Sequence, residues 1–319
     1  MKSSRSLCAN SGSSLTSSST EPAIDKPRGA HPLAPHAALI AVQISFSGLH
    51  IVGKVVLETL PPLAVASFRV LIATPLLLGL AWYVDRRLPP WNLLPHLALL
   101  GLLGVFLNQV LFVVGLKYTT ATNAAILMSS VPVFAVGIGW LTGIEKIGAG
   151  RLAGVILAAS GALVLLDPRR FSMADASFLG TFLILMNSLS FATFLVLQRP
   201  LLSRLPWRTV IAWTFLFGGI GVIAVGGNTV ANVDMSEVSP SIWWGVLFIG
   251  LVPTFFGYLL NTWAVRRSSV TLVAVYTTLQ PLLTALLAIV LLREQLRPSQ
   301  VVGFALIASG LWLVSWRRR

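Results

Sequence analysis

Four ionisable side chains that lie close together in the sequence are the first candidates for chemistry: His50, Lys54, Glu58 and Arg69. His50, Lys54 and Glu58 are spaced by four residues, which places them on one face of an α-helix. All four lie in long apolar stretches, where charged groups are costly and usually face a bundle interior or a water-filled cavity. We therefore predict that His50, Lys54 and Arg69 contribute to a binding site. The alternative for Lys54 and Glu58 is an ion pair that reaches out of the apolar region.

Arg69 is the strongest of these candidates because its own apolar run contains no acidic partner. A guanidinium group well inside an apolar run is suited to attracting a carboxylate. A structural role in helix packing is the alternative for this side chain. Three uncharged polar residues within apolar runs, and one aromatic residue, complete the candidate binding set: Asn187, Tyr276, Gln280 and Trp213. A buried amide must find a partner wherever it lies, so each polar candidate either joins two helices or contacts a ligand.

Two prolines, Pro132 and Pro281, lie in the middle of apolar runs. A proline inside a helix removes one backbone hydrogen bond and frees a carbonyl, here that of Met128 or Thr277. A packing kink is one explanation. Because the two breaks occur at matching places in the chain, we also predict a gating role for both prolines beside a central site.

Other patterns of chemistry are excluded by what surrounds them. The run Gly48–Val55 reads G-x-x-x-x-G-K-V, which lacks the Ser or Thr that a phosphate-binding loop needs after its lysine. The four histidines, His31, His36, His50 and His96, have no metal-ligand spacing, and Cys8 has no second cysteine to pair with. No nucleophile is paired with a base in the middle of an apolar run. We therefore predict that the protein is not an enzyme and has no cofactor or metal site.

The composition requires an apolar solvent for most of the chain. Of 319 residues, 55% are hydrophobic and only 10% are charged, and the mean hydropathy is +0.83. A soluble domain has roughly 25% charged residues. The formal charge of +13 arises from basic residues between apolar runs, without a continuous basic and aromatic stripe. We therefore expect a lipid bilayer as partner and no nucleic acid.

We predict an all-α integral membrane protein with ten transmembrane helices, since about 20 apolar residues cross a bilayer. The expected spans are 36–57, 61–82, 94–115, 119–141, 149–166, 178–198, 208–226, 241–263, 270–292 and 299–316. Residues 1–33 form a Ser-rich polar segment, interpreted as a disordered cytoplasmic tail. An organelle transit peptide is the alternative interpretation of this segment.

The basic residues outside the spans orient the chain. Sixteen Lys and Arg lie on the side of the two termini and only five on the other side. By the positive-inside rule both termini are cytoplasmic, in a cell (inner or plasma) membrane.

The membrane region is a duplication. A shift of 149 positions aligns Pro132 with Pro281 and Glu145 with Glu294, and a shift of 145 aligns Ser45-Phe46 with Ser190-Phe191. The two repeats are 36–166 and 176–316. Each holds five spans, an odd number, so the second repeat must be inverted in the membrane. Inverted repeats supply two related arrangements that can open to opposite sides, which favours transport by alternating access.

The motifs in their order resemble those of EamA-domain proteins of the drug/metabolite transporter superfamily. The motifs that carry the resemblance are Glu58–Arg69, Ser130–Ala135, Leu279–Leu287, Leu292–Leu296, Val302-Gly303 and Ala308–Gly310. The first repeat departs from the family pattern at Gly143–Lys146, which has one extra apolar residue before the glutamate. The resemblance implies ten helices, both termini inside the cell, and efflux of amino acids or other small metabolites.

We therefore expect a secondary transporter, an exporter of amino acids or similar small metabolites, with a small-molecule substrate. The alternatives are a drug exporter, an organelle metabolite carrier and a scaffold that does not transport. No span has an acidic residue near its middle, which argues against the proton exchange of small multidrug exporters. The patterns Gly139-x-x-x-Gly143 and Gly150-x-x-x-Gly154 predict helix contacts, either within one chain or in a homodimer.

Overall fold

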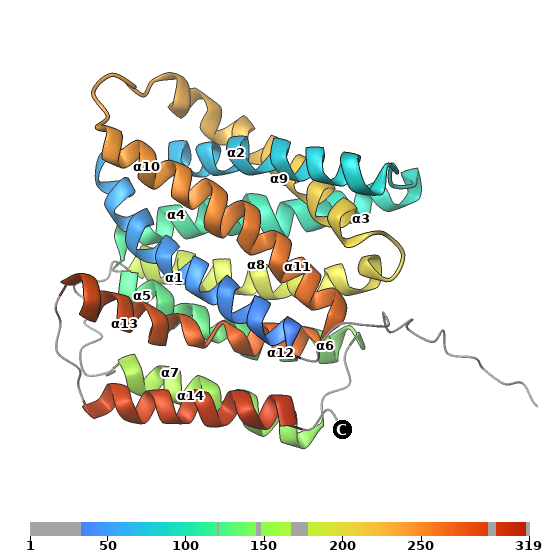
Figure 1. Ribbon diagram of the computed structural model, residues 1–319, viewed down its shortest axis with the longest axis vertical. Coiled ribbons are helices and arrows are strands. Elements are labelled where there is room, and N and C mark those ends of the chain that lie inside the picture. The colour runs from blue at the N-terminus through green and yellow to red at the C-terminus, as the bar shows by residue number, and fades with distance from the viewer. Residues whose placement is uncertain (1–32, 120, 145–147, 167–177, 293–297, 317–319) are drawn as a thin grey trace, which may run out of the picture. The chain divides into compact units, whose positions relative to one another are not determined.

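The computed structural model describes residues 33–119, 121–144, 148–166, 178–292 and 298–316. These residues belong to one compact unit, and every regular element among them is a helix (Figure 1). The predicted tail, apart from residue 33, and the matched residues Glu145 and Glu294 lie outside the described part of the chain.

The described residues of the first half of the chain contain ten helical elements. They are α1 (Ala34–Thr59), α2 (Pro62–Asp85), η1 (Trp91–Leu93), α3 (Leu94–Gly101), η2 (Leu102–Leu107), α4 (Asn108–Tyr118), α5 (Ala121–Leu127), η3 (Met128–Ser130), α6 (Val131–Leu141) and α7 (Ala149–Leu166). The second half contains α8 (Phe178–Leu202), α9 (Trp207–Ala231), α10 (Pro240–Ile249), η5 (Gly250–Gly257), α11 (Tyr258–Arg267), α12 (Val270–Tyr276), α13 (Leu279–Leu292) and α14 (Pro298–Trp316).

These elements form the membrane-spanning helices that the sequence predicts. Within the described residues, eight helical stretches are long and apolar enough to cross a membrane. The fifth and tenth predicted spans correspond to shorter apolar stretches, Leu152–Gly161 within α7 and Val301–Gly310 within α14. The all-α membrane fold is confirmed, whereas the number of ten transmembrane helices stays a prediction, since the described residues contain eight full-length spans and two shorter apolar helices.

The second helix of each half begins in the same way. Pro61 is the N-cap of α2, and Pro206 is the N-cap of α9 exactly 145 positions later. Proline is favoured where a helix starts, because the missing N–H is one that has no partner inside the helix. The repeated Leu-Pro pair therefore fixes the start of both helices.

The packing of α4 shows that the two halves are inverted. Its neighbour α1 runs parallel to it, since the ring of His50 meets that of Phe112 edge to face and Lys54 reaches the carbonyl of Leu116. Its neighbour α8 runs antiparallel, because Asn187 bonds the carbonyl of Asn108 while the later residue Ser190 bonds the carbonyl of Leu103, which is earlier in the chain. Thus α1 and α8, the first helices of the two halves, run in opposite directions. The predicted inverted repeat is confirmed.

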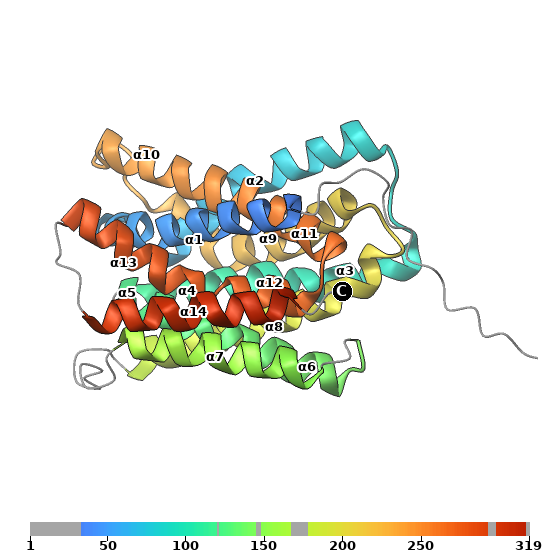
Figure 2. The same ribbon diagram turned by 60° about the horizontal axis from the view of Figure 1, so that its bottom comes forward.

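The last helices of the two halves, α7 and α14, lie side by side in both views (Figures 1 and 2). A Cβ atom added at Gly310 would lie 2.7 Å from the carbonyl oxygen of Gly154 and 2.6 Å from the backbone nitrogen of Ala158. The two backbones therefore touch, as small residues allow in membrane helix pairs. The contact predicted for Gly154 lies within one chain.

Two irregular segments recur in both halves. The third span of each half contains a π-helical segment, η2 or η5, and these segments begin 148 residues apart. The fourth span is interrupted at Met128–Ser130 in the first half and at Thr277 and Thr278 in the second. Each interruption precedes one of the two matched prolines. The carbonyls of Met128 and Thr277 accept N–H groups three residues ahead, so neither is left without a partner.

Candidate functional site

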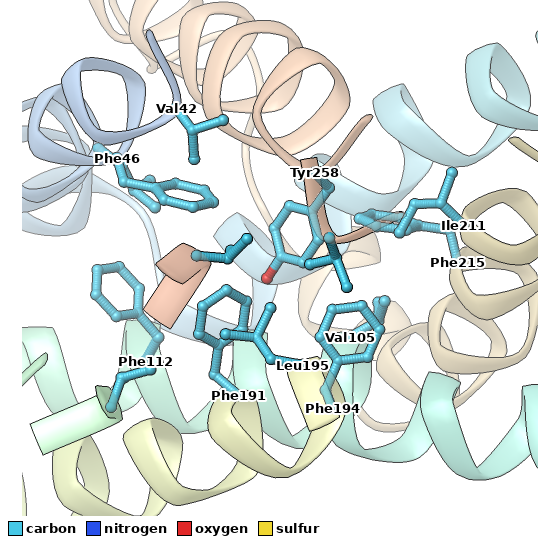
Figure 3. Packing of buried hydrophobic residues seen from close by; sticks show 14 of the residues in the cluster. Val42, Phe46, Val105, Phe112, Phe191, Phe194, Leu195, Ile211, Phe215 and Tyr258 are labelled. Atoms are coloured by element: carbon cyan, nitrogen blue, oxygen red, sulfur yellow. The ribbon is translucent and has the colours of Figure 1, made fainter. Parts of the chain in front are cut away.

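A small cavity lies between the two halves of the chain. Its volume of about 30 Å³ is room for one or two water molecules. The residues that line it are Phe46, Leu49, His50, Arg69, Asn108, Phe112, Met128, Asn187, Phe191, Tyr258 and Gln280. Figure 3 shows the aromatic rings of Phe46, Phe112, Phe191 and Tyr258 gathered in this region. The cavity is therefore walled mainly by aromatic and apolar groups, with a few polar ones.

The cavity lies at the interface between the two repeats. Phe46 and Phe191 occupy equivalent positions, 145 residues apart, and their rings meet edge to face with 6.4 Å between centroids. Two equivalent residues can touch each other only where the pseudo-two-fold axis passes between them. Transporters with inverted repeats bind their substrates at this kind of interface.

Arg69 on α2 brings a positive charge to the cavity. Its side chain is only 2% exposed, and its Nε donates to Thr254 Oγ1 at 3.0 Å, while Nη1 has no partner among the residues that the structure describes. The hydroxyl of Thr254, on η5, donates in turn to the carbonyl of Ile249 at 2.6 Å. Among the described residues the ion pair present is Arg208–Asp85, and no carboxylate lies beside Arg69. A buried charge without a counter-ion is costly, so the site is suited to an anionic group from outside.

His50 on α1 supplies a hydrogen-bond acceptor. Its Nδ1 lies 2.7 Å from the carbonyl of Phe46, which can only accept, so Nδ1 carries the proton. The lone pair of the neutral ring is then on Nε2. This atom is buried and has no partner within the described structure.

Two amides supply further acceptors. Asn187 on α8 donates its Nδ2 to the carbonyl of Asn108 at 2.6 Å, and its Oδ1 is buried without a partner in the described part of the chain. Gln280 on α13 donates its Nε2 to Gln43 Oε1 at 2.8 Å, and its Oε1 is likewise unpartnered. Because an amide nitrogen donates and its oxygen accepts, each side chain is oriented by the bond that it makes.

The unpartnered atoms around the cavity form a simple pattern. One cationic donor, Nη1 of Arg69, is accompanied by three acceptors on His50, Asn187 and Gln280. Seventeen buried side-chain N and O atoms of the described residues have no hydrogen-bond partner, and these four share one cavity. A ligand with a carboxylate at one end and a group with several N–H donors at the other would satisfy all four.

The polar residues of the cavity are not duplicated with the repeat. At the usual shift of 145, the position of Arg69 corresponds to Thr214 and that of His50 to Leu195. Both of these residues are buried. The scaffold is therefore repeated, whereas the charge and the imidazole come from the first copy alone.

Four of the seven predicted binding candidates, Arg69, His50, Asn187 and Gln280, line this cavity, and three do not. Tyr276 hydrogen-bonds His36 Nδ1 at 2.6 Å, and Trp213 packs against Phe217 with 5.9 Å between ring centroids. Lys54 donates to three carbonyls at the end of α4 and in the following turn, those of Leu116, Lys117 and Thr119. Its ammonium group caps a helix end, and the carboxylate of Glu58 is close enough to attract it electrostatically.

The sequence candidates omit several lining residues, chiefly Tyr258 and the phenylalanines. The duplicated Ser-Phe pair could have drawn attention to Phe46 and Phe191, since a residue type kept at both positions of a repeat can meet at its axis. No comparable signal marks Tyr258, because Gln109 occupies its position in the first copy. Its place in the site depends on tertiary packing.

Comparisons with known proteins agree with this architecture. The sequence pattern of the EamA-like transporter family matches residues 34–167 and again residues 178–316. A WAT1-related protein of Arabidopsis thaliana is 30% identical over 313 residues, which cover 88% of this chain and 80% of the relative. An uncharacterized transporter of Archaeoglobus fulgidus is 28% identical over 284 residues, with 88% and 96% covered. A protein of known crystal structure shares the fold, with a TM-score of 0.70, 19% identity and 90% and 97% coverage.

Proposed function

Because the chain belongs to the EamA-like transporter family, we propose that it is a secondary carrier that exports amino acids or similar small zwitterionic metabolites by alternating access. Membership of this family, in the drug/metabolite transporter superfamily, makes the chain a multi-pass membrane transporter with a small-molecule substrate. The substrate class, the direction and the membrane are the finer parts of the proposal. The distribution of basic residues supports cytoplasmic termini, and we propose the cell membrane as the location.

One observation carries the proposed substrate class: the set of four unpartnered polar atoms around the cavity. An amino acid zwitterion has a carboxylate that suits the guanidinium of Arg69. Its ammonium group has three N–H donors, which matches the three acceptors of His50, Asn187 and Gln280. The aromatic wall around Phe46 and Tyr258 would contact the apolar part of the substrate.

The size of the cavity supports a transport cycle. A volume of about 30 Å³ is far below the roughly 300 Å³ of the smallest typical ligand pockets. A substrate can occupy the site only if the surrounding helices separate on one side. We propose that this narrow form of the site alternates with wider forms that open to one side of the membrane or the other.

The same site argues against the export of cationic drugs. The charged group in its wall is the Arg69 cation, and no Asp or Glu is among the residues that line it. A second cation would be repelled in a low-dielectric cavity. The predicted drug-exporter alternative is therefore not favoured by any observed contact.

Release from proteoliposomes tests the proposed function. Vesicles containing the purified protein would be loaded with labelled amino acids, with amino acid methyl esters, with carboxylic acids that lack the amino group, and with a cationic drug. We expect release of the amino acids to exceed that of the other three classes, because only the zwitterion pairs with both ends of the site. Equal release of the ester and the amino acid would contradict the proposed role of the carboxylate, and no release of any class from folded protein would contradict a carrier.

A further inference from the structure

The helix cap made by Lys54 has an equivalent in the second half of the chain. Arg199, near the end of α8, donates its Nη1 to the carbonyls of Val265 and Ser268 at the end of α11 and in the following turn. Arg199 lies 145 positions after Lys54. Its acceptors lie 149 positions after Leu116 and Thr119, two of the three acceptors of Lys54. Offsets of 145 and 149 residues are the ones that align the two repeats. The donors and the acceptors of the two caps therefore occupy equivalent positions in the two copies.

The chemistry of the two caps is the same although the side chains differ. The last carbonyls of a helix have no partner within the helix, and the negative end of the helix dipole lies there. A cation from a neighbouring helix satisfies these carbonyls with charge-assisted hydrogen bonds. The ammonium of Lys54 makes three such bonds, at 3.0, 3.2 and 2.8 Å, so its three N–H groups are all used.

The two caps lie on opposite faces of the membrane. Lys54 lies at the end of α1, which runs parallel to α4, whereas α8 runs antiparallel to both. Arg199 therefore lies at the opposite end of the bundle from Lys54. We refer to these ends as the Lys54 face and the Arg199 face.

Each cap joins helices that also form the cavity wall. The Lys54 cap ties α1, which carries His50, to the turn that leads from α4 into the interrupted fourth span with Met128. The Arg199 cap ties α8, which carries Asn187, to the turn that leads into the equivalent interrupted span with Gln280. Each cap thus fixes the separation of cavity-lining helices at one face only.

We infer that Lys54 and Arg199 are an equivalent pair of positioning residues, each of which holds the transport pathway shut at its own face. Both caps are formed in this structure, in agreement with its small cavity. Opening one face separates the helices that the local cap joins and so breaks that cap, while the cap at the other face stays formed. The inference rests on the proposed alternating access, but it concerns the protein without substrate.

Accessibility of the cavity from each face tests this inference. Cys8 is the sole cysteine of the chain, so Cys8→Ser gives a background into which Met128→Cys places one thiol in the cavity wall. A membrane-impermeant thiol reagent would be applied to either face of oriented vesicles, without substrate. We expect Lys54→Met to raise the ratio of labelling from the Lys54 face to labelling from the Arg199 face about tenfold, which corresponds to about 1.4 kcal/mol. We expect Arg199→Met to lower the same ratio by a similar factor.

Matched variants separate this role from simple stabilisation. Lys54→Arg and Arg199→Lys keep the cation and should keep the parent ratio. Lys117→Met and Arg266→Met remove exposed cations at the same two helix ends and should also leave the ratio unchanged. The double variant of Lys54→Met and Arg199→Met should return the ratio towards that of the parent. If the Met variants do not fold, Lys54→Gln and Arg199→Gln provide the same comparison, since an amide keeps part of the hydrogen bonding.

Two results would overturn the inference: shifts of both single variants in the same direction, or an unchanged ratio in folded protein. Either would mean that the caps only stabilise the helix ends. This readout is independent of the substrate assay. Opposite shifts of the labelling ratio without release of amino acids would support the paired caps and contradict the proposed substrate. Release of amino acids with unchanged labelling ratios would support the proposed substrate and contradict the paired caps.

Discussion

The hydroxyl of Tyr258 donates a hydrogen bond of 2.5 Å to Oδ1 of Asn108. Each residue is the first of an α-helix that follows a π-helical segment, Asn108 after η2 and Tyr258 after η5. The bond therefore joins the two halves at matching irregular points in the cavity wall. Because π-helical segments occur frequently at functional sites, this link places the irregular backbone where we propose that substrate binds.

Replacement of Arg69 tests the proposed carboxylate contact. We expect Arg69→Ala to reduce amino acid transport at least about tenfold, since a charge-assisted hydrogen bond contributes roughly 1.5–3 kcal/mol. Arg69→Lys should retain part of the activity because it keeps the charge but not the planar fork. Initial rates of release from proteoliposomes measure the effect. Arg86→Ala, at the exposed end of the same helix, is the control, and equal rates for Arg69→Ala and this control would remove Arg69 from the site.

The lone pair of His50 predicts a pH dependence of binding. Protonation of Nε2 would remove the acceptor and add a second positive charge beside Arg69, so a substrate ammonium group would be repelled. The other ionisable group that lines the cavity is Tyr258. We expect the half-saturation concentration for an amino acid to rise as the pH falls. His50→Gln keeps a polar group that does not titrate and should flatten this dependence. An unchanged pH profile in His50→Gln would assign the titration to another group.

Straightening an interrupted span tests the predicted gating role of the prolines. Pro281→Ala restores a backbone N–H that can bond the carbonyl of Thr277, which now accepts from Gln280. We expect a lower maximal transport rate with little change in half-saturation concentration, because the hinge rather than the site is altered. Concentration dependence of the initial rate separates the two parameters. Pro200→Ala, at an exposed position in the last turn of α8, is the control, and identical kinetics in both variants would contradict a hinge at Pro281.

A close contact between α3 and α9 makes Gly218 intolerant of larger residues. A Cβ atom there would lie 2.4 Å from the carbonyl oxygen of Gly101 and 2.5 Å from Cβ of Val105. We expect Gly218→Ala to cost about 1–3 kcal/mol of stability, as overpacking does, and to lower the Tm of the solubilised protein. Gly79→Ala is the control because nothing lies within 4 Å of its added Cβ. A Tm for Gly218→Ala equal to that of the control would contradict the packing.

Much of the fold could be predicted because the bilayer restricts the possibilities. The long apolar runs, the odd number of spans per repeat and the matched Leu-Pro pairs predict inverted helical halves, as the structure confirms. The interruptions near Pro132 and Pro281 follow from the missing N–H of proline. Of the two π-helical segments, η5 contains Pro253, whereas η2 has no proline and so no such local cause in the sequence.

The site was predicted less completely, for a physical reason. Depth in an apolar run identifies side chains that must be buried, such as Arg69 and His50, but it does not say which way each helix faces. Lys54 illustrates the difficulty, because its acceptors are backbone carbonyls more than 60 residues away. Every residue has a backbone carbonyl, so the sequence does not indicate which carbonyls accept a hydrogen bond from Lys54.

The single copy of Arg69 within a duplicated scaffold has a kinetic consequence. The scaffold can present two open forms of similar energy, but Thr214 stands where a second arginine would be. A substrate arriving from one face therefore meets the guanidinium along a different approach from one arriving at the other face. Rates of entry and release at the two faces are then unequal even when the overall equilibrium across the membrane is unchanged. We therefore expect the proposed carrier to respond more steeply to substrate supplied on one side of the membrane than on the other, without any external control.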